Sequence, residues 1–278
     1  MALNADLHCH STVSDGFLTP TEVVHRAVAN GVELLALTDH DELGGLGEAR
    51  QTAEAAGLAF VDGVEVSVTW KLETVHIVGL GVDPADPGLQ AGLATVRSGR
   101  DERARQMADG LAKAGIHGVL EGARQLAGNP AMVSRAHFAR HLVKTGLMPN
   151  VQTVFHHYLV RGKPGFVEHE WASLEDAVGW IRDAGGVAVV AHPARCRLSE
   201  AELLGLFDRF RDLGGEAIEV VSGAHDAASI DRFARIARRY GFLASRASDF
   251  HGAQESPVDL GRAPPLPPDL TPVWTALS

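Results

Sequence analysis

Short apolar segments alternate with segments of helical periodicity along most of this chain, and this alternation strongly restricts the possible folds. Strands are predicted at residues 5–8, 34–38, 59–65, 75–79, 187–191, 217–221 and 243–245. Helices are predicted at residues 19–31, 45–57, 97–114, 134–145, 173–184, 199–213 and 229–240. Repeated strand–helix units favour parallel strands with right-handed crossovers, in an open sheet or a barrel.

The alternation stops in the middle of the chain. Residues 97–166 carry helical patterns and no convincing strand, whereas strand–helix units resume after them. We therefore predict a helical insertion domain at 97–166, placed between the two parts of one α/β domain, 1–96 and 167–278. The proline-rich tail at 264–272 is expected to be irregular.

Charge and cysteine content exclude several classes of protein. The formal net charge of −10 is unsuited to coating long nucleic acids, which requires clustered Lys and Arg. Two cysteines, Cys9 and Cys196, favour neither a disulfide framework nor a thiolate zinc site. The chain has no apolar run of roughly 20 residues and no leader-like start, so we expect a cytoplasmic enzyme with no membrane contact.

Ionisable side chains follow the first two predicted strands. His8 and His10 are two residues apart on a strand, so their side chains face the same way and could begin a metal site. Taken alone, they could equally be a solvent-exposed pair. Asp15 precedes a glycine and could be a simple turn residue, but it lies in the same strand–helix connection. His40 follows the second strand between two aspartates, which could otherwise cap a helix.

The later strands show the same pattern. Glu65 is expected at the end of the third strand, where it could bridge two metals or be an ordinary surface residue. His76 lies within an apolar run, where a neutral core histidine is the common explanation. His192 ends a long apolar strand, and Asp249 and His251 follow the last one. The mouth of a parallel α/β fold is formed by such strand ends.

Taken together, these residues favour a metal centre. Histidines mixed with carboxylates, without thiolates, suit divalent ions such as Mn, Fe or Zn. The candidates exceed the needs of one tetrahedral site, so two or three metals are expected. Such clusters activate water in phosphoryl transfer. No GxGxxG or P-loop pattern points to a dinucleotide or ATP site.

The motifs resemble those of the PHP (polymerase and histidinol phosphatase) family of metal-dependent phosphoesterases. The matching segments are 6–11, 38–41, 63–67, 191–193 and 248–251, in the family's order. The resemblance implies a distorted seven-stranded β/α barrel with a three-metal site. It assigns His8, His10, Glu65 and Asp249 to one metal, Asp15, His40 and His251 to a second, and Glu65, His76 and His192 to a third. Among these, Asp15, His40, Glu65, His192 and Asp249 are our candidate catalytic residues. Asp15 stands where histidinol phosphatases often carry histidine.

Within this family, segments 97–107, 134–140 and 162–167 look like the branch of 3′,5′-nucleoside bisphosphate phosphatases. The resemblance implies a manganese enzyme that removes the 3′-phosphate from a small nucleotide such as adenosine 3′,5′-bisphosphate, with no stable protein partner. The candidates for binding the second phosphate are Ser134, Arg135, Lys163, Arg195, Arg100 and Arg103. For Arg100 and Arg103, the charged run at 100–103 is also typical of a solvated helix face.

Several points stay open from sequence alone. Arg246 could narrow the pocket or contact phosphate, His225 or His137 could be the general acid, and Trp171 could approach the substrate. A 5′-to-3′ exonuclease acting on short RNA would use the same metals. A non-catalytic nucleotide-binding or metal-binding module and a C–N hydrolase are further alternatives.

Overall fold

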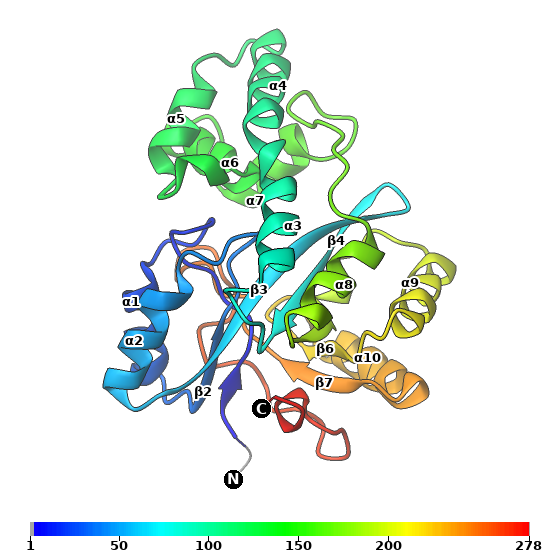
Figure 1. The fold of residues 1–278 in the computed structure, drawn as a ribbon. Helices are drawn as coiled ribbons and strands as arrows, with labels where there is room; N and C mark the ends of the chain where they lie inside the picture. Colours follow the sequence, from blue (N-terminus) through cyan, green and yellow to red (C-terminus); the bar gives the residue numbers. More distant parts are fainter. Residues whose placement is uncertain (1–2, 278) are drawn as a thin grey trace.

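A seven-stranded sheet forms the centre of the computed structural model, which describes residues 3–277 (Figure 1). The strands follow one another in chain order: β1 (Ala5–Asp6), β2 (Leu34–Leu37), β3 (Ala59–Trp70), β4 (Glu73–Leu80), β5 (Val187–Val190), β6 (Ala217–Val221) and β7 (Leu243–Arg246). The Leu7 N–H donates to the Arg246 carbonyl at 3.1 Å, and the His10 N–H to the Phe250 carbonyl at 2.9 Å. These bonds join the segment after β1 to the end of β7 and to the segment that follows it, and they nearly close the sheet. The predicted distorted seven-stranded α/β barrel is therefore confirmed.

One part of the topology differs from the prediction, because β4 runs antiparallel to both β3 and β5. Only Lys71 and Leu72 separate β3 from β4, and both have positive φ, 50° and 68°. A two-residue hairpin turn of this kind reverses the chain, so a parallel arrangement is impossible here. The other strand pairs are parallel. Because β3 is twelve residues long, Glu65 lies in its middle, and the predicted position at the strand end is wrong.

The barrel helices cover the outer face of the sheet. They are α1 (Pro20–Ala29), α2 (Leu46–Ala56), α3 (Pro87–Ser98), α8 (Leu174–Asp183), α9 (Glu200–Asp212) and α10 (Ala227–Tyr240). Helix α1 begins with the predicted capping box between Thr19 and Glu22, which satisfies free N–H groups of its first turn. Apolar faces of α1 and α2 pack on β2, whereas those of α8, α9 and α10 pack on β3 to β6.

The middle of the chain forms its own group of helices, drawn in green on one side of the barrel in Figure 1. They are α4 (Arg100–Lys113), α5 (Val119–Leu126), α6 (Arg135–Lys144) and α7 (Val151–Val154), followed by a π-helical turn (Phe155–Leu159). A separate apolar cluster that includes Leu111, Phe138 and Leu159 holds them together. The division of the chain at residues 97 and 166 stays a prediction.

The helix predicted at 97–114 is in fact the end of one helix and the whole of another. Helix α3 ends at Ser98, and α4 begins at Arg100 after Gly99. A Cβ atom at Gly99 would lie 2.6 Å from the His169 ring, so a larger residue between the two helices would have to displace that ring. Among residues 3–277, no helix is both long and apolar enough to cross a bilayer. Met1 and Ala2, at the start of the segment considered above as a possible leader, lie outside the described part of the chain.

Candidate metal centre

Nine histidine and carboxylate side chains meet at one mouth of the barrel. Their ligand atoms form overlapping groups in which all atoms lie within 4.8 Å of one another. The nine residues are those predicted as metal ligands: His8, His10, Asp15, His40, Glu65, His76, His192, Asp249 and His251. They come from six of the seven strands or from the segments that follow them, so the fold gathers residues that are far apart in sequence.

Glu65 lies at the centre of this cluster. Its Oε2 atom is 3.3 Å from Nε2 of both His8 and His10 and 2.7 Å from Nδ1 of His40. Its Oε1 atom is 2.9 Å from Nδ1 of His76 and 2.9 Å from Nε2 of His192. A backbone bridge between His40 and Glu65 places the middle of β3 beside the end of β2. One fully buried carboxylate therefore faces five imidazoles.

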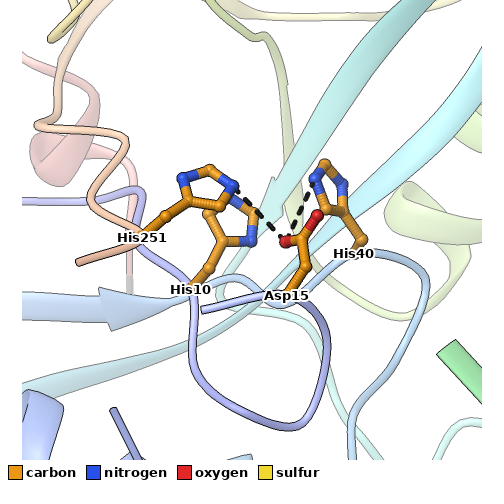
Figure 2. Close-up of side chains that lie close together, drawn as sticks. All are labelled: His10, Asp15, His40 and His251. Atoms are coloured by element: carbon orange, nitrogen blue, oxygen red, sulfur yellow. Dashed lines mark ion pairs between the residues drawn. The ribbon is translucent and has the colours of Figure 1, made fainter. Parts of the chain in front are cut away.

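The other two carboxylates occupy the flanks. The Oδ1 atom of Asp249 lies 3.7 Å from Nε2 of His8 and 3.4 Å from Nε2 of His10. The Oδ1 atom of Asp15 lies 3.8 Å from Nε2 of His40 and 3.4 Å from Nε2 of His251. Figure 2 shows Asp15 between the rings of His40 and His251, with His10 beside them. His10 therefore lies close enough to bind a metal together with Asp15, His40 and His251, or together with His8 and Asp249.

The cluster contains buried polar atoms that the described residues leave without hydrogen bonds. These are His10 Nδ1, Asp15 Oδ1, His40 Nδ1, Glu65 Oε2, His192 Nδ1 and Asp249 Oδ1. An unsatisfied buried polar group costs about 1–3 kcal/mol, and more if it is charged. Divalent cations would satisfy these atoms, and mixed imidazole and carboxylate donors suit such ions. The residues present therefore fit a site for divalent metals.

The electrostatics of the cluster favour cation binding. Burial would raise the pKa of Glu65, but attraction from His40, His76 and His8 outweighs it and holds the pKa well below its usual range. Burial would lower the pKa of His40, but attraction from Glu65 and Asp15 raises it to about 9. For His10, burial and repulsion from His251 and His40 lower the pKa to about 3. The carboxylates stay charged at neutral pH, and the crowded imidazoles cannot all hold protons.

Glu219 is a supporting residue that the sequence analysis missed. Its Oε1 atom lies 2.6 Å from Nδ1 of His8, and its Oε2 atom accepts a 2.7 Å hydrogen bond from the His192 N–H. The sequence did contain a signal, since a glutamate in the middle of the fully buried strand β6 needs a partner. Carboxylates of this kind orient metal-binding histidines.

We expect Glu219→Gln to weaken divalent metal binding by about 10–100-fold, because the neutral amide holds the His8 ring less firmly. Calorimetric titration with Mn²⁺ would measure the change. The matched control is Glu216→Gln, an exposed glutamate just before the same strand, which should bind as the parent does. An unchanged affinity in Glu219→Gln would refute the orienting role.

Asp39 organises the loop that carries Asp15. It accepts hydrogen bonds from the Ser11 N–H at 2.8 Å and from the hydroxyls of Ser11 and Ser14 at 2.6 and 2.5 Å. A Cβ atom at Gly16 would lie 2.4 Å from the His10 carbonyl oxygen, so the residue after Asp15 must be glycine. Sequence alone marked Asp39 only as a neighbour of His40.

The two arginines of the charged run at 100–103 are buried, with exposed fractions of 5% and 7%, and do not form a solvated helix face. Arg100 makes an ion pair with buried Asp41. Arg103 has no ion pair among the described residues, and its Nε atom has no hydrogen-bond partner there. Burial and repulsion from Arg135 and Arg100 lower the pKa of Arg103 to about 9. Helix periodicity could not show this, because other segments cover the helix.

The other predicted phosphate-binding residues lie in different settings. Ser134 caps α6, and its hydroxyl donates to Asp15 Oδ2 at 3.1 Å. Arg135 follows it, is half-buried, and makes no ion pair within residues 3–277. Lys163 is exposed on a loop. Arg195 pairs through Nη1 with Oδ2 of Asp249 at 2.5 Å, so its charge is directed at the cluster.

The suggestion that Arg246 lines the pocket is wrong. Its guanidinium donates to the backbone carbonyls of Ala5, Gly261, Ala263 and Pro264, and so ties β1 and the C-terminal segment to β7. Arg246 therefore serves the packing of the chain ends. Sequence could not show this, since the carbonyls come from distant segments.

Both general-acid candidates have structural contacts. His137 Nδ1 accepts a hydrogen bond from the Ser134 N–H at 3.0 Å, and burial lowers its pKa to about 4. His137 is therefore neutral at pH 7. His225 donates from Nδ1 to the Val220 carbonyl at 3.0 Å and stacks on Phe233. The contacts of the described residues therefore do not support either histidine as the general acid.

Comparison with known proteins now identifies the family. Residues 6–184 match the model of the PHP domain family. The chain belongs to the PHP family. A 3′,5′-nucleoside bisphosphate phosphatase from Chromobacterium violaceum is 54% identical over 99% of this chain and 96% of its own length. A 5′-3′ exoribonuclease from Haemophilus influenzae is 40% identical over 99% of both chains.

Solved structures of PHP-type enzymes share the fold. An amidohydrolase from Chromobacterium violaceum, with bound sulfate and no metal, superposes with a TM-score of 0.96 at 54% identity, covering 99% of this chain and 95% of its own. A metal-dependent phosphoesterase from Bifidobacterium adolescentis gives a TM-score of 0.83 at 26% identity, with the same coverage. The predicted family and the prediction of a hydrolase are both confirmed.

Proposed function

We propose that this PHP protein is a metal-dependent phosphatase that removes the 3′-phosphate from nucleoside 3′,5′-bisphosphates and leaves the 5′-monophosphate. The observation that carries the proposal is the buried Arg103, which has no ion pair among the described residues. An uncompensated buried guanidinium is costly unless an anion pairs with it. With half-buried Arg135 close enough to repel it, Arg103 forms a site for a second phosphate. The similarity to the Chromobacterium phosphatase supports this substrate.

The nine clustered side chains would hold two or three divalent ions, with manganese as our choice and iron or zinc as alternatives. Bound there, the ions would supply positive charge at the scissile phosphate and activate water for attack on phosphorus. Glu65 sets the spacing of the cluster, because both its oxygens face imidazoles. Arg195 directs a guanidinium at the Asp249 side, where it can also contact phosphate oxygens. All nine candidate ligands are present, which argues against a non-catalytic binding module.

The helical insertion, proposed at 97–166, would hold the second phosphate over the metal centre. Ser134 already connects α6 to Asp15, and Arg135 is the next residue. The N-terminus of a helix and an adjacent guanidinium form a favourable phosphate site. Lys163 would extend this site from its exposed loop. Both cysteines are free thiols, which suits the proposed role in nucleotide metabolism in the cytoplasm.

We expect Mn²⁺-loaded protein to release phosphate from adenosine 3′,5′-bisphosphate with AMP as the product. Arg135→Ala should lower kcat/KM by about 10²-fold, because hydrogen bonds to charged groups are worth roughly 1.5–3 kcal/mol each. A phosphate-release assay with chromatographic identification of AMP measures both. The control is Arg105→Ala, an exposed arginine on α4. Equal losses in both variants would contradict the assignment of Arg135.

Cleavage of short RNA from its 5′ end is the second candidate function. The similarity to the Haemophilus exoribonuclease over 99% of the chain favours it. A 5′-phosphorylated oligonucleotide distinguishes the two functions. Release of mononucleotides, without hydrolysis of adenosine 3′,5′-bisphosphate, would keep the metal chemistry and replace the proposed substrate.

A further inference from the structure

Trp171 is fixed where the chain returns from the insertion to the barrel. Its N–H donates to the Thr69 hydroxyl at 2.8 Å, and its Nε1–H donates to the Thr74 hydroxyl at 3.3 Å. The next residue, Ala172, forms a backbone bridge with Val68. Trp171 is therefore held against both strands of the β3–β4 hairpin, the same hairpin that carries Glu65.

Two arginines from the other end of the insertion pack on this indole. The guanidinium carbons of Arg100 and Arg103 lie 4.8 and 5.1 Å from the centre of the Trp171 ring. The His169 ring meets the indole edge-on, with centroids 4.3 Å apart. Arginine heads at this distance from an aromatic ring are stabilised by cation–π attraction, which is stronger when water is excluded. The tryptophan thus sets the position of both guanidiniums.

The two arginines differ in their remaining partners. Asp41 pairs with Arg100 and also accepts hydrogen bonds from the Ser67 N–H and hydroxyl, at 2.7 and 2.8 Å. This neutralises Arg100 and fixes it to the barrel. Arg103 has the aromatic face but no carboxylate among the described residues. Its positive charge is consequently available to a ligand.

We propose that Trp171 is a positioning residue for substrate selection: together with the neutral Asp41–Arg100 pair, it holds Arg103 in place for the phosphate that is not hydrolysed. This inference rests on the proposed function. It predicts a specific role for the indole in distinguishing nucleoside 3′,5′-bisphosphates from nucleoside 3′-monophosphates. A base-stacking role would instead act equally on both substrates, because both contain the base.

The test compares kcat/KM for adenosine 3′,5′-bisphosphate with kcat/KM for adenosine 3′-monophosphate, using Mn²⁺-loaded full-length protein. We expect Trp171→Leu to reduce the ratio of the two by about tenfold, mainly through KM for the bisphosphate. Trp171→Phe should retain part of the ratio, since phenylalanine still presents an aromatic face. The control is Trp274→Leu, a half-buried tryptophan in the C-terminal segment, which should keep the parent's ratio.

A ratio in Trp171→Leu equal to that of the parent, or no difference between the leucine and phenylalanine variants, overturns the proposal. A calorimetric titration with AMP and with adenosine 3′-monophosphate separates this inference from the proposed function, because it needs no turnover. If neither substrate is hydrolysed, selective weakening of AMP binding in Trp171→Leu still supports the proposal. Equal affinity of the variant and the parent for AMP overturns it.

Discussion

Replacing Glu65 by glutamine should lower the rate of phosphate release by about 10³-fold or more and remove bound divalent metal. The carboxylate faces five imidazoles at 2.7–3.3 Å, and no other side chain can take its place because it is fully buried. The loss corresponds to roughly 4 kcal/mol, in line with the several kcal/mol that metal ions contribute to catalysis. Glutamine keeps the size of the side chain, so the effect reports the charge.

The measurement has two parts, kcat with adenosine 3′,5′-bisphosphate and metal content per chain after dialysis. The control is Glu54→Gln, at an exposed position on α2, which should match the parent in kcat and in metal content. Full metal content together with kcat within tenfold of the parent would show that Glu65 is not the centre of the site. Loss of kcat with full metal content would confine its role to the reaction itself.

Replacing Arg246 by methionine should lower the free energy of unfolding by about 3–5 kcal/mol, the range for removing one partner from a buried charged contact. The side chain is 6% exposed and donates to four backbone carbonyls, which lose their partner in the variant. For a chain of this size, that change lowers Tm by roughly 10 °C. Thermal unfolding followed by circular dichroism gives the value.

The matched control is Arg238→Met, whose exposed ion pair with Asp269 is worth at most about 1 kcal/mol. At 25 °C, kcat/KM of the folded Arg246→Met protein should stay within about twofold of the parent, because its guanidinium contacts backbone carbonyls and none of the nine candidate ligand side chains. A fall in kcat/KM with an unchanged Tm would restore the interpretation of Arg246 as a phosphate contact.

Much of the fold could be predicted because its signals are local. Strand alternation predicts that His8 and His10 face the same way, and their Nε2 atoms do meet at 3.0 Å, although β1 ends before them at Asp6. The capping box at Thr19 and Glu22 marks the start of α1. The sequence did not predict the hairpin, because the chain reverses at Lys71 and Leu72. Both residues have positive φ, which is unusual for lysine and leucine. The sequence pattern of an apolar strand does not show whether the neighbouring strand is parallel or antiparallel.

The candidate ligands could be selected from sequence because histidines and carboxylates at strand ends are chemically conspicuous and match a family pattern. Only the tertiary structure decided which atoms meet. It placed Glu65 in mid-strand beside His40, and it added Glu219 as a partner of His8. These contacts join residues up to 211 positions apart, and no local periodicity encodes them.

The sequence by itself determined most of the helices and strands and the residue types of the metal centre, because each depends on side-chain chemistry and short-range pattern. The choice of a barrel over an open sheet came from the family resemblance. Only the tertiary structure decided which groups the arginines contact. Arg100 pairs with Asp41, Arg103 lies over Trp171 without an ion pair among the described residues, and Arg246 donates to backbone carbonyls. A guanidinium is the same in every sequence, and its role follows from which distant groups surround it after folding.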